Sequence, residues 1–111
     1  MSWFKRKLFF IKRRIKWFFQ RRIRGFDDSE IFSLDYTILE FLLPRLKRYR
    51  KIQGGHPGCL NSSEEWEEIL DKIIFFVEYF LEHEGFGTEE LEEKSKEGRE
   101  LFFEYFHALW F

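Results

Sequence analysis

The stretch SSEEWEEILDKIIFFVEYF, residues 62–80, decides the fold that this sequence predicts. Its apolar side chains recur at i, i+3, i+4 and i+7, the spacing of one face of an α-helix. They are Trp66, Ile69, Leu70, Ile73, Phe76, Val77 and Phe80. Ser62 with Glu65 fits a capping box, in which the two side chains satisfy backbone N–H groups at a helix start. The stretch therefore predicts a buried helix that begins near Ser62 and ends at Gly85 and Gly87.

Towards the N-terminus, a strongly basic helix is expected from about Trp3 to Arg24, with Gly25 as its stop. Its apolar stripe consists of Phe4, Leu8, Ile11, Ile15, Phe18, Phe19 and Ile23. Its ten cations are Lys5, Arg6, Lys7, Lys12, Arg13, Arg14, Lys16, Arg21, Arg22 and Arg24, and the helix carries no Asp or Glu. Like charges one turn apart repel, so such a helix needs an anionic partner to compensate them.

A second helix is expected to begin at a cap formed by Asp28 or Ser29. Its buried stripe is predicted to be Ile31, Leu34, Ile38, Phe41 and Leu42. Pro44 lacks a backbone donor, so the helix should kink or break there and continue as a short basic segment, residues 45–52. A Gly-rich loop, residues 53–58, follows.

A fourth helix is expected after a Thr88 cap, with Gly98 in its interior. Its predicted inner face is Leu91, Phe102, Tyr105, Phe106 and Leu109. Glycine inside a helix costs about 1 kcal/mol against alanine, unless a close helix crossing requires it. The predicted fold is an all-α, compact four-helix bundle in a single domain, residues 1–111. Within it we separate the basic amphipathic helix 1–24 from a helical core, residues 25–111.

Charge is sorted along the chain. Residues 1–51 hold 15 Lys and Arg against 5 Asp and Glu, whereas residues 52–111 hold 4 against 15. Such asymmetry points to an anionic partner, and it equally suits two halves that fold onto each other. The opposite charges and the 22% of aromatic residues also favour self-association, as a dimer.

The composition limits the class of protein. A single cysteine, Cys59, excludes an internal disulfide and suits a reducing cytosol. No apolar run approaches the roughly 20 residues of a transmembrane helix. The start of the chain lacks a small-residue cleavage site and makes a poor signal peptide.

Several segments resemble one family of small, uncharacterised bacteriophage proteins. The matching pieces are Arg24–Glu30, Leu34–Ile38, Leu43–Lys47, Gly55–Pro57, Glu65–Lys72, Glu97–Phe102, Tyr105–Phe106 and Leu109–Trp110. The resemblance covers most of residues 24–111 and leaves out the basic start. It implies a phage origin, a helical fold and a location in the cytoplasm of the bacterial host cell. It implies no known activity, so no catalytic residue is carried over.

The candidate ligand-binding residues are Arg24, Arg45 and Arg48, with Tyr36 or Tyr49 against a base. Arginine presents a planar fork that grips phosphate, and an aromatic ring can stack on a nucleobase. Gly25 and Pro44 leave these arginines beside unpaired backbone donors. The alternative is a basic helix end that complements the helix dipole and pairs with the acidic helices.

No metal site, cofactor or catalytic set is predicted. Asp27, Asp28 and Asp35 fit capping and ion pairing better than a metal cluster. His56 and Cys59 have the spacing H-x-x-C, but zinc needs two further ligands, so a loop histidine and a buried cysteine are expected.

The sequence therefore predicts a non-enzymatic phage accessory protein. Its leading role is counter-defence by sequestering an anionic nucleotide, such as a host immune signalling nucleotide. One alternative is a protein–protein inhibitor of a host defence or replication protein. Another is a membrane-surface protein that acts through the amphipathic helix, residues 3–24. No nucleic-acid-binding module is recognised, so nucleic acid is not an expected partner.

Overall fold

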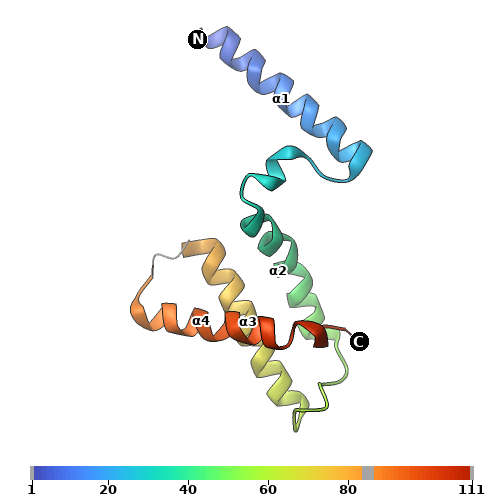
Figure 1. Ribbon diagram of the computed structural model, residues 1–111, viewed down its shortest axis with the longest axis vertical. Helices are drawn as coiled ribbons and strands as arrows, with labels where there is room; N and C mark the ends of the chain where they lie inside the picture. Colours follow the sequence, from blue (N-terminus) through green and yellow to red (C-terminus); the bar gives the residue numbers. More distant parts are fainter. Residues whose placement is uncertain (1, 84–86, 111) are drawn as a thin grey trace. The chain divides into compact units, whose positions relative to one another are not determined.

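The fold is all-α, as the sequence predicts, in a computed structural model that describes residues 2–83 and 87–110. The described residues form four α-helices, two 3-10 helices and no strand (Figure 1). These elements are α1 (Trp3–Arg24), η1 (Asp28–Ile31), α2 (Leu34–Ile52), α3 (Ser63–His83), α4 (Glu89–Glu104) and η2 (Phe106–Ala108).

The chain divides into two compact units, Met1–Thr37 and Ile38–Phe111. Helix α2 begins in the first unit and continues in the second. The sequence-based division placed residues 25–37 with the core, whereas here they group with α1. The two units are described separately below.

Helix α1 has the bounds that the sequence predicts. The Ser2 hydroxyl caps its start by accepting from the backbone N–H of Lys5 at 3.2 Å. Gly25 ends it with φ +85°, a left-handed conformation that glycine adopts without a Cβ penalty. Local signals are therefore sufficient to define this helix.

The expected start of the second helix is wrong. Asp27, rather than Asp28 or Ser29, is the capping residue, and it begins the short 3-10 helix η1. The Asp27 carboxylate accepts from the Ser29 N–H, while Glu30 accepts from the Asp27 N–H, which completes a capping box. Because η1 ends at Ile31, α2 starts afresh at Leu34.

The expected break at Pro44 is absent, because α2 runs through it as one helix. Proline lacks the N–H that would donate to the carbonyl of Glu40, four residues earlier, and its ring crowds that carbonyl. Glu40 and Pro44 are both exposed, so water can satisfy this carbonyl. A kink at Pro44 is not confirmed.

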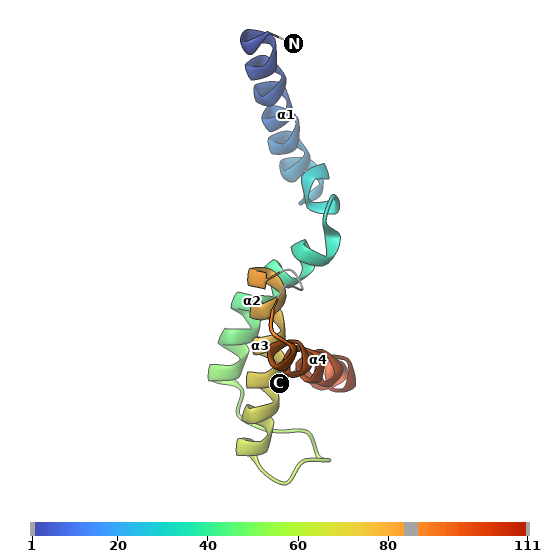
Figure 2. The same ribbon diagram turned by 90° about the vertical axis from the view of Figure 1, so that its left-hand side faces the viewer.

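In the second unit, α3 lies between α2 and α4 (Figures 1 and 2). Its side chains Trp66, Leu70, Ile73 and Val77 are almost fully buried. They form one cluster with Leu39 and Leu46 of α2, and partly buried side chains of α4 and the C-terminal segment pack against it. The face predicted from residues 62–80 is therefore the centre of the core.

The buried face predicted for the second helix is wrong in four of its five residues, because only Leu42 is partly buried and packs against the core. Ile31, Leu34, Ile38 and Phe41 are all at least half exposed, whereas Leu39 and Leu46 are buried. The last two are seven residues apart and share one face of α2. Apolar residues occupy two faces of this helix, and the face of Leu39 and Leu46 turns inward. Ion pairs between partly exposed side chains also join α2 to α3. These pairs are Lys47–Glu78 at 2.8 Å, Arg50–Asp71 at 3.0 Å and Arg50–Glu67 at 3.7 Å.

Both acidic helices start where the sequence predicts. Ser62 Oγ accepts from the Glu65 N–H, although the Glu65 carboxylate accepts from Asn61 rather than from Ser62. The Thr88 hydroxyl caps α4 by accepting from the Leu91 N–H at 3.3 Å. Helix α3 is described up to His83, and the predicted stop at Gly85 lies outside the described residues.

Gly98 marks a close crossing of α3 and α4. A Cβ atom on it would lie 2.1 Å from the Lys72 carbonyl oxygen and 2.8 Å from the Phe76 Cβ. The glycine is buried, and its missing side chain lets the two backbones approach. This explains why α4 tolerates a glycine in its interior. The prediction that Phe106 lies on the inner face of α4 is wrong, because its side chain is 63% exposed.

Candidate functional site

The most unusual surface of the first unit is the apolar stripe of α1. We define the stripe as Phe4, Leu8, Ile11, Ile15, Phe18 and Phe19, which share one face at helical spacing. These side chains are 40–66% exposed, and no residue of α1 is buried. The sequence predicts these six residues together with Ile23, which is 83% exposed, but the first unit does not use the stripe as a core.

The opposite face of α1 is the one that the first unit covers. Arg21 donates to Asp27, and Arg24 Nη2 lies 2.5 Å from Asp28 Oδ1. The Gln20 side chain donates to Asp28 Oδ2 and accepts from the Asp28 N–H, each at 2.8 Å. The turn that follows α1 therefore folds back onto its polar side.

Aromatic contacts extend this packing by one turn. The rings of Trp17 and Phe32 meet edge to face with centroids 6.4 Å apart. The Arg13 guanidinium lies over both rings, 4.7 Å from the first and 5.4 Å from the second. Successive side chains turn by about 100° around a helix. This places Arg13 and Trp17 away from the stripe and leaves the stripe uncovered within the unit.

The two aspartates of this turn are held as anions. A hydrogen bond from the Ser29 hydroxyl, together with Arg21, lowers the pKa of Asp27 below its ordinary value. The Gln20 amide and then Arg24 lower the pKa of Asp28. These aspartates thereby neutralise cations on the covered side of α1.

The remaining cations border the stripe. Lys5 and Lys12 lie along one edge of it, and Lys7 and Arg14 lie along the other. Within the described part of the first unit, none of these four has a carboxylate within 4.0 Å. The arrangement is an apolar strip flanked on both sides by cations without a carboxylate partner.

The predicted ligand residues fall in both units. In the first unit, Arg24 is engaged by Asp28, donates to the Phe26 carbonyl at 3.1 Å and lies 4.5 Å from the Phe26 ring. Tyr36 is half-buried in the first turns of α2, where its backbone N–H donates to the Asp35 carboxylate. Arg24 thus acts here as an ion-pair partner, and a ligand would compete with Asp28 for it.

In the second unit, Arg45 lies one turn of α2 from both Arg48 and Tyr49, whereas Arg48 and Tyr49 are adjacent in sequence and point about 100° apart. Arg45 donates to the Phe41 carbonyl at 2.9 Å, with its guanidinium 3.6 Å from the Phe41 ring centre. Arg48 is exposed. Anion binding by this group stays a prediction.

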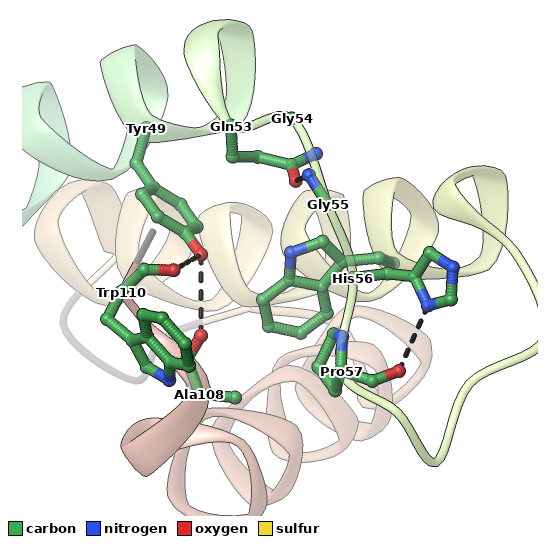
Figure 3. A pocket seen from close by; sticks show the side chains of 9 residues that line it. Tyr49, Gln53, Gly54, Gly55, His56, Pro57, Ala108 and Trp110 are labelled. Atoms are coloured by element: carbon green, nitrogen blue, oxygen red, sulfur yellow. Dashed lines mark hydrogen bonds between the residues drawn. The ribbon is translucent and has the colours of Figure 1, made fainter.

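Tyr49 has a structural task that the sequence does not reveal. Its hydroxyl donates to the Trp110 carbonyl at 3.0 Å and lies 3.4 Å from the Ala108 carbonyl (Figure 3). The bond joins α2 to the C-terminal segment across 61 positions of sequence. No local sequence motif predicts the contact between Tyr49 and Trp110.

Beside this bond lies a cavity of about 420 Å³ (Figure 3). Its walls come from the end of α2, the Gly-rich loop, α3 and the C-terminal segment. Tyr49, Gly54, Gly55, Pro57, Trp66 and Trp110 line it. The sequence indicates the loop and Tyr49, but it gives no sign that Trp110 joins them.

Among the described residues, no group of three or more His, Cys, Asp or Glu side chains could hold a metal ion. His56 Nδ1 lies 3.0 Å from the Pro57 carbonyl oxygen. Cys59 was expected to be buried, and it is exposed instead, because it lies in the connection before α3. Among the described helices, none is long and apolar enough to cross a membrane.

Comparisons with protein-family models, with curated proteins and with solved structures find no match to this chain. The resemblance to a family of phage proteins therefore stays a prediction that rests on the motifs of residues 24–111.

Proposed function

We propose that this protein is a binding protein that attaches to an anionic lipid surface through α1. The observation that supports this proposal is the stripe of α1, which is uncovered in its unit and flanked by cations without carboxylate partners. A helix of this kind lies in the plane of the interface, with its apolar face among the acyl chains and its cations at the headgroups.

Both parts of the helix contribute to attachment. Burying one Phe, Leu or Ile side chain fully is worth about 1.5–3 kcal/mol. Each Lys or Arg beside an anionic surface adds about 1 kcal/mol. The long stems of Lys5, Lys12, Lys7 and Arg14 can lie along the apolar boundary while their charges reach the headgroups.

The turn after α1 suits this orientation. It covers the face opposite the stripe, and its acidic side chains Asp27 and Asp28 are paired with Arg21 and Arg24. Repulsion between these carboxylates and an anionic surface is thereby reduced. The first unit would therefore present its cationic, apolar side to the lipid.

The experiment is vesicle co-sedimentation with the full chain. One set of vesicles is phosphatidylcholine alone, and the other holds equal amounts of phosphatidylcholine and phosphatidylglycerol. The protein should bind the anionic vesicles more strongly, and added salt should weaken binding. The variant Leu8→Glu with Ile15→Glu should bind at least about ten-fold more weakly.

Phe103→Glu with Phe106→Glu is the matched control, because it places the same two charges at exposed aromatic positions of the second unit, which are 71% and 63% exposed. It should bind as the parent does. Circular dichroism should show that both variants keep their helices. If the parent ignores both kinds of vesicle, or if the stripe variant binds them as the parent does, the proposal is wrong.

Nucleotide sequestration, inhibition of a host protein, counter-defence and dimer formation all stay predictions from the sequence. Binding of duplex DNA that survives the two stripe substitutions would favour the ten cations of α1 as a nucleic-acid surface instead.

A further inference from the structure

We propose that the cavity beside Tyr49 binds a flat heteroaromatic ring, with a nucleobase as the ligand class. The cavity lies wholly within the second unit and involves no residue of α1. It is therefore independent of the proposed attachment to lipid. Its volume of about 420 Å³ is in the range of small-molecule sites.

The walls are aromatic and come from separate segments. Trp66 of α3 is 1% exposed and packs against Tyr105, with ring centroids 5.6 Å apart, so it forms a fixed wall. Tyr49 enters from α2. Trp110 enters from the C-terminal segment and is 75% exposed. Aromatic side chains that converge on one space offer stacking surfaces for a planar ring, and stacking tolerates any base.

Trp110 is held at the cavity by its backbone. The Tyr49 hydroxyl donates to its carbonyl, and the preceding residues form η2, in which the Ala108 N–H donates to the Tyr105 carbonyl at 2.9 Å. The structure thus fixes the chain here while it leaves the indole largely exposed. Exposed tryptophan beside a cavity is typical of a residue that contacts a partner.

The glycines of the loop also favour a ligand site at this cavity. A Cβ atom on Gly54 or Gly55 would meet nothing within 4 Å, and neither residue has the positive φ that excludes other side chains. Neither packing nor backbone conformation therefore requires glycine at these positions. Glycine does allow a ligand to approach the backbone closely.

Polar groups at the rim can read the edge of a ring. The Gln53 side chain accepts from the Gly55 N–H at 3.2 Å, which orients its amide beside the cavity (Figure 3). An amide both donates and accepts, as the edge of a nucleobase does. The described lining contains no Asp or Glu, so an attached phosphate would meet no fixed negative charge there.

Isothermal titration with adenosine and with adenosine monophosphate tests the proposal on the full chain. Both ligands should bind, because the cavity is proposed to recognise the adenine ring that they share. Trp110→Ala should weaken adenosine binding at least about five-fold. Trp3→Ala removes another exposed tryptophan outside the second unit and should leave binding unchanged.

Gly55→Leu provides a second variant, because it enlarges a residue that lines the cavity at a position where a Cβ atom meets nothing within 4 Å. It should also abolish most binding, while its thermal unfolding stays that of the parent. The proposal fails if the parent binds neither probe, or if both cavity variants bind adenosine as the parent does. Binding of the monophosphate alone would also overturn it, since the phosphate and not the ring would then be recognised.

Discussion

Gly98→Ala is the sharpest test of how the second unit is packed. In an isolated helix this change should stabilise, because alanine is favoured over glycine by about 1 kcal/mol. Here the new Cβ would lie 2.1 Å from the Lys72 carbonyl oxygen, and such contacts are essentially never shorter than 3.0 Å. The two helices would have to separate by about 1 Å at their crossing.

The obstacle is backbone, so no side chain can rotate away from it. Overpacking of this kind costs about 1–3 kcal/mol, and we expect the upper end of that range. After subtraction of the helix propensity gain, the free energy of unfolding should fall by about 2 kcal/mol. For a domain of this size that lowers Tm by about 10 °C.

Urea and thermal unfolding followed by circular dichroism measure the effect. Gly54→Ala is the matched control, because its Cβ would meet nothing within 4 Å and the change should stay within about 0.5 kcal/mol. A Gly98→Ala protein as stable as the parent, or more stable, would refute the close crossing of α3 and α4.

Two further predictions concern ionisable groups. The buried Tyr79 hydroxyl donates to Glu92 at 2.6 Å, and burial, then this bond, raises its pKa to about 12. The unfolded chain ionises at its ordinary value of 10.0, so stability should fall as pH rises between the two values. Tyr79→Phe should remove this pH dependence and cost about 1 kcal/mol at neutral pH, measured by urea unfolding. For Asp27 and Asp28 the folded pKa is lowered, so their stabilising effect is present above the ordinary value of 3.8 and is lost as pH falls through the folded pKa. Carboxyl ¹³C shifts should show both titrating below 3.8, and a normal pKa for either would contradict its hydrogen bonds.

Helix identity and several helix ends follow from the sequence by itself. Gly25 ends α1 and Thr88 starts α4 because a left-handed stop and a hydroxyl cap act within one turn. The buried face of α3 follows too, since its apolar side chains recur at unbroken helical spacing over residues 66–80. The composition also reveals the apolar, cationic character of α1.

The tertiary structure alone decides which faces are used and which distant residues meet. Leu39 and Leu46 were missed because α2 has two apolar faces, and packing against α3 decides which of them is buried. Asp27 was missed as a cap because neighbouring aspartate and serine residues offer the same local signal. The bond from Tyr49 to Trp110 joins residues 61 positions apart. Local patterns specify how each segment folds, whereas long-range contacts depend on how the segments pack, which no spacing in the sequence records.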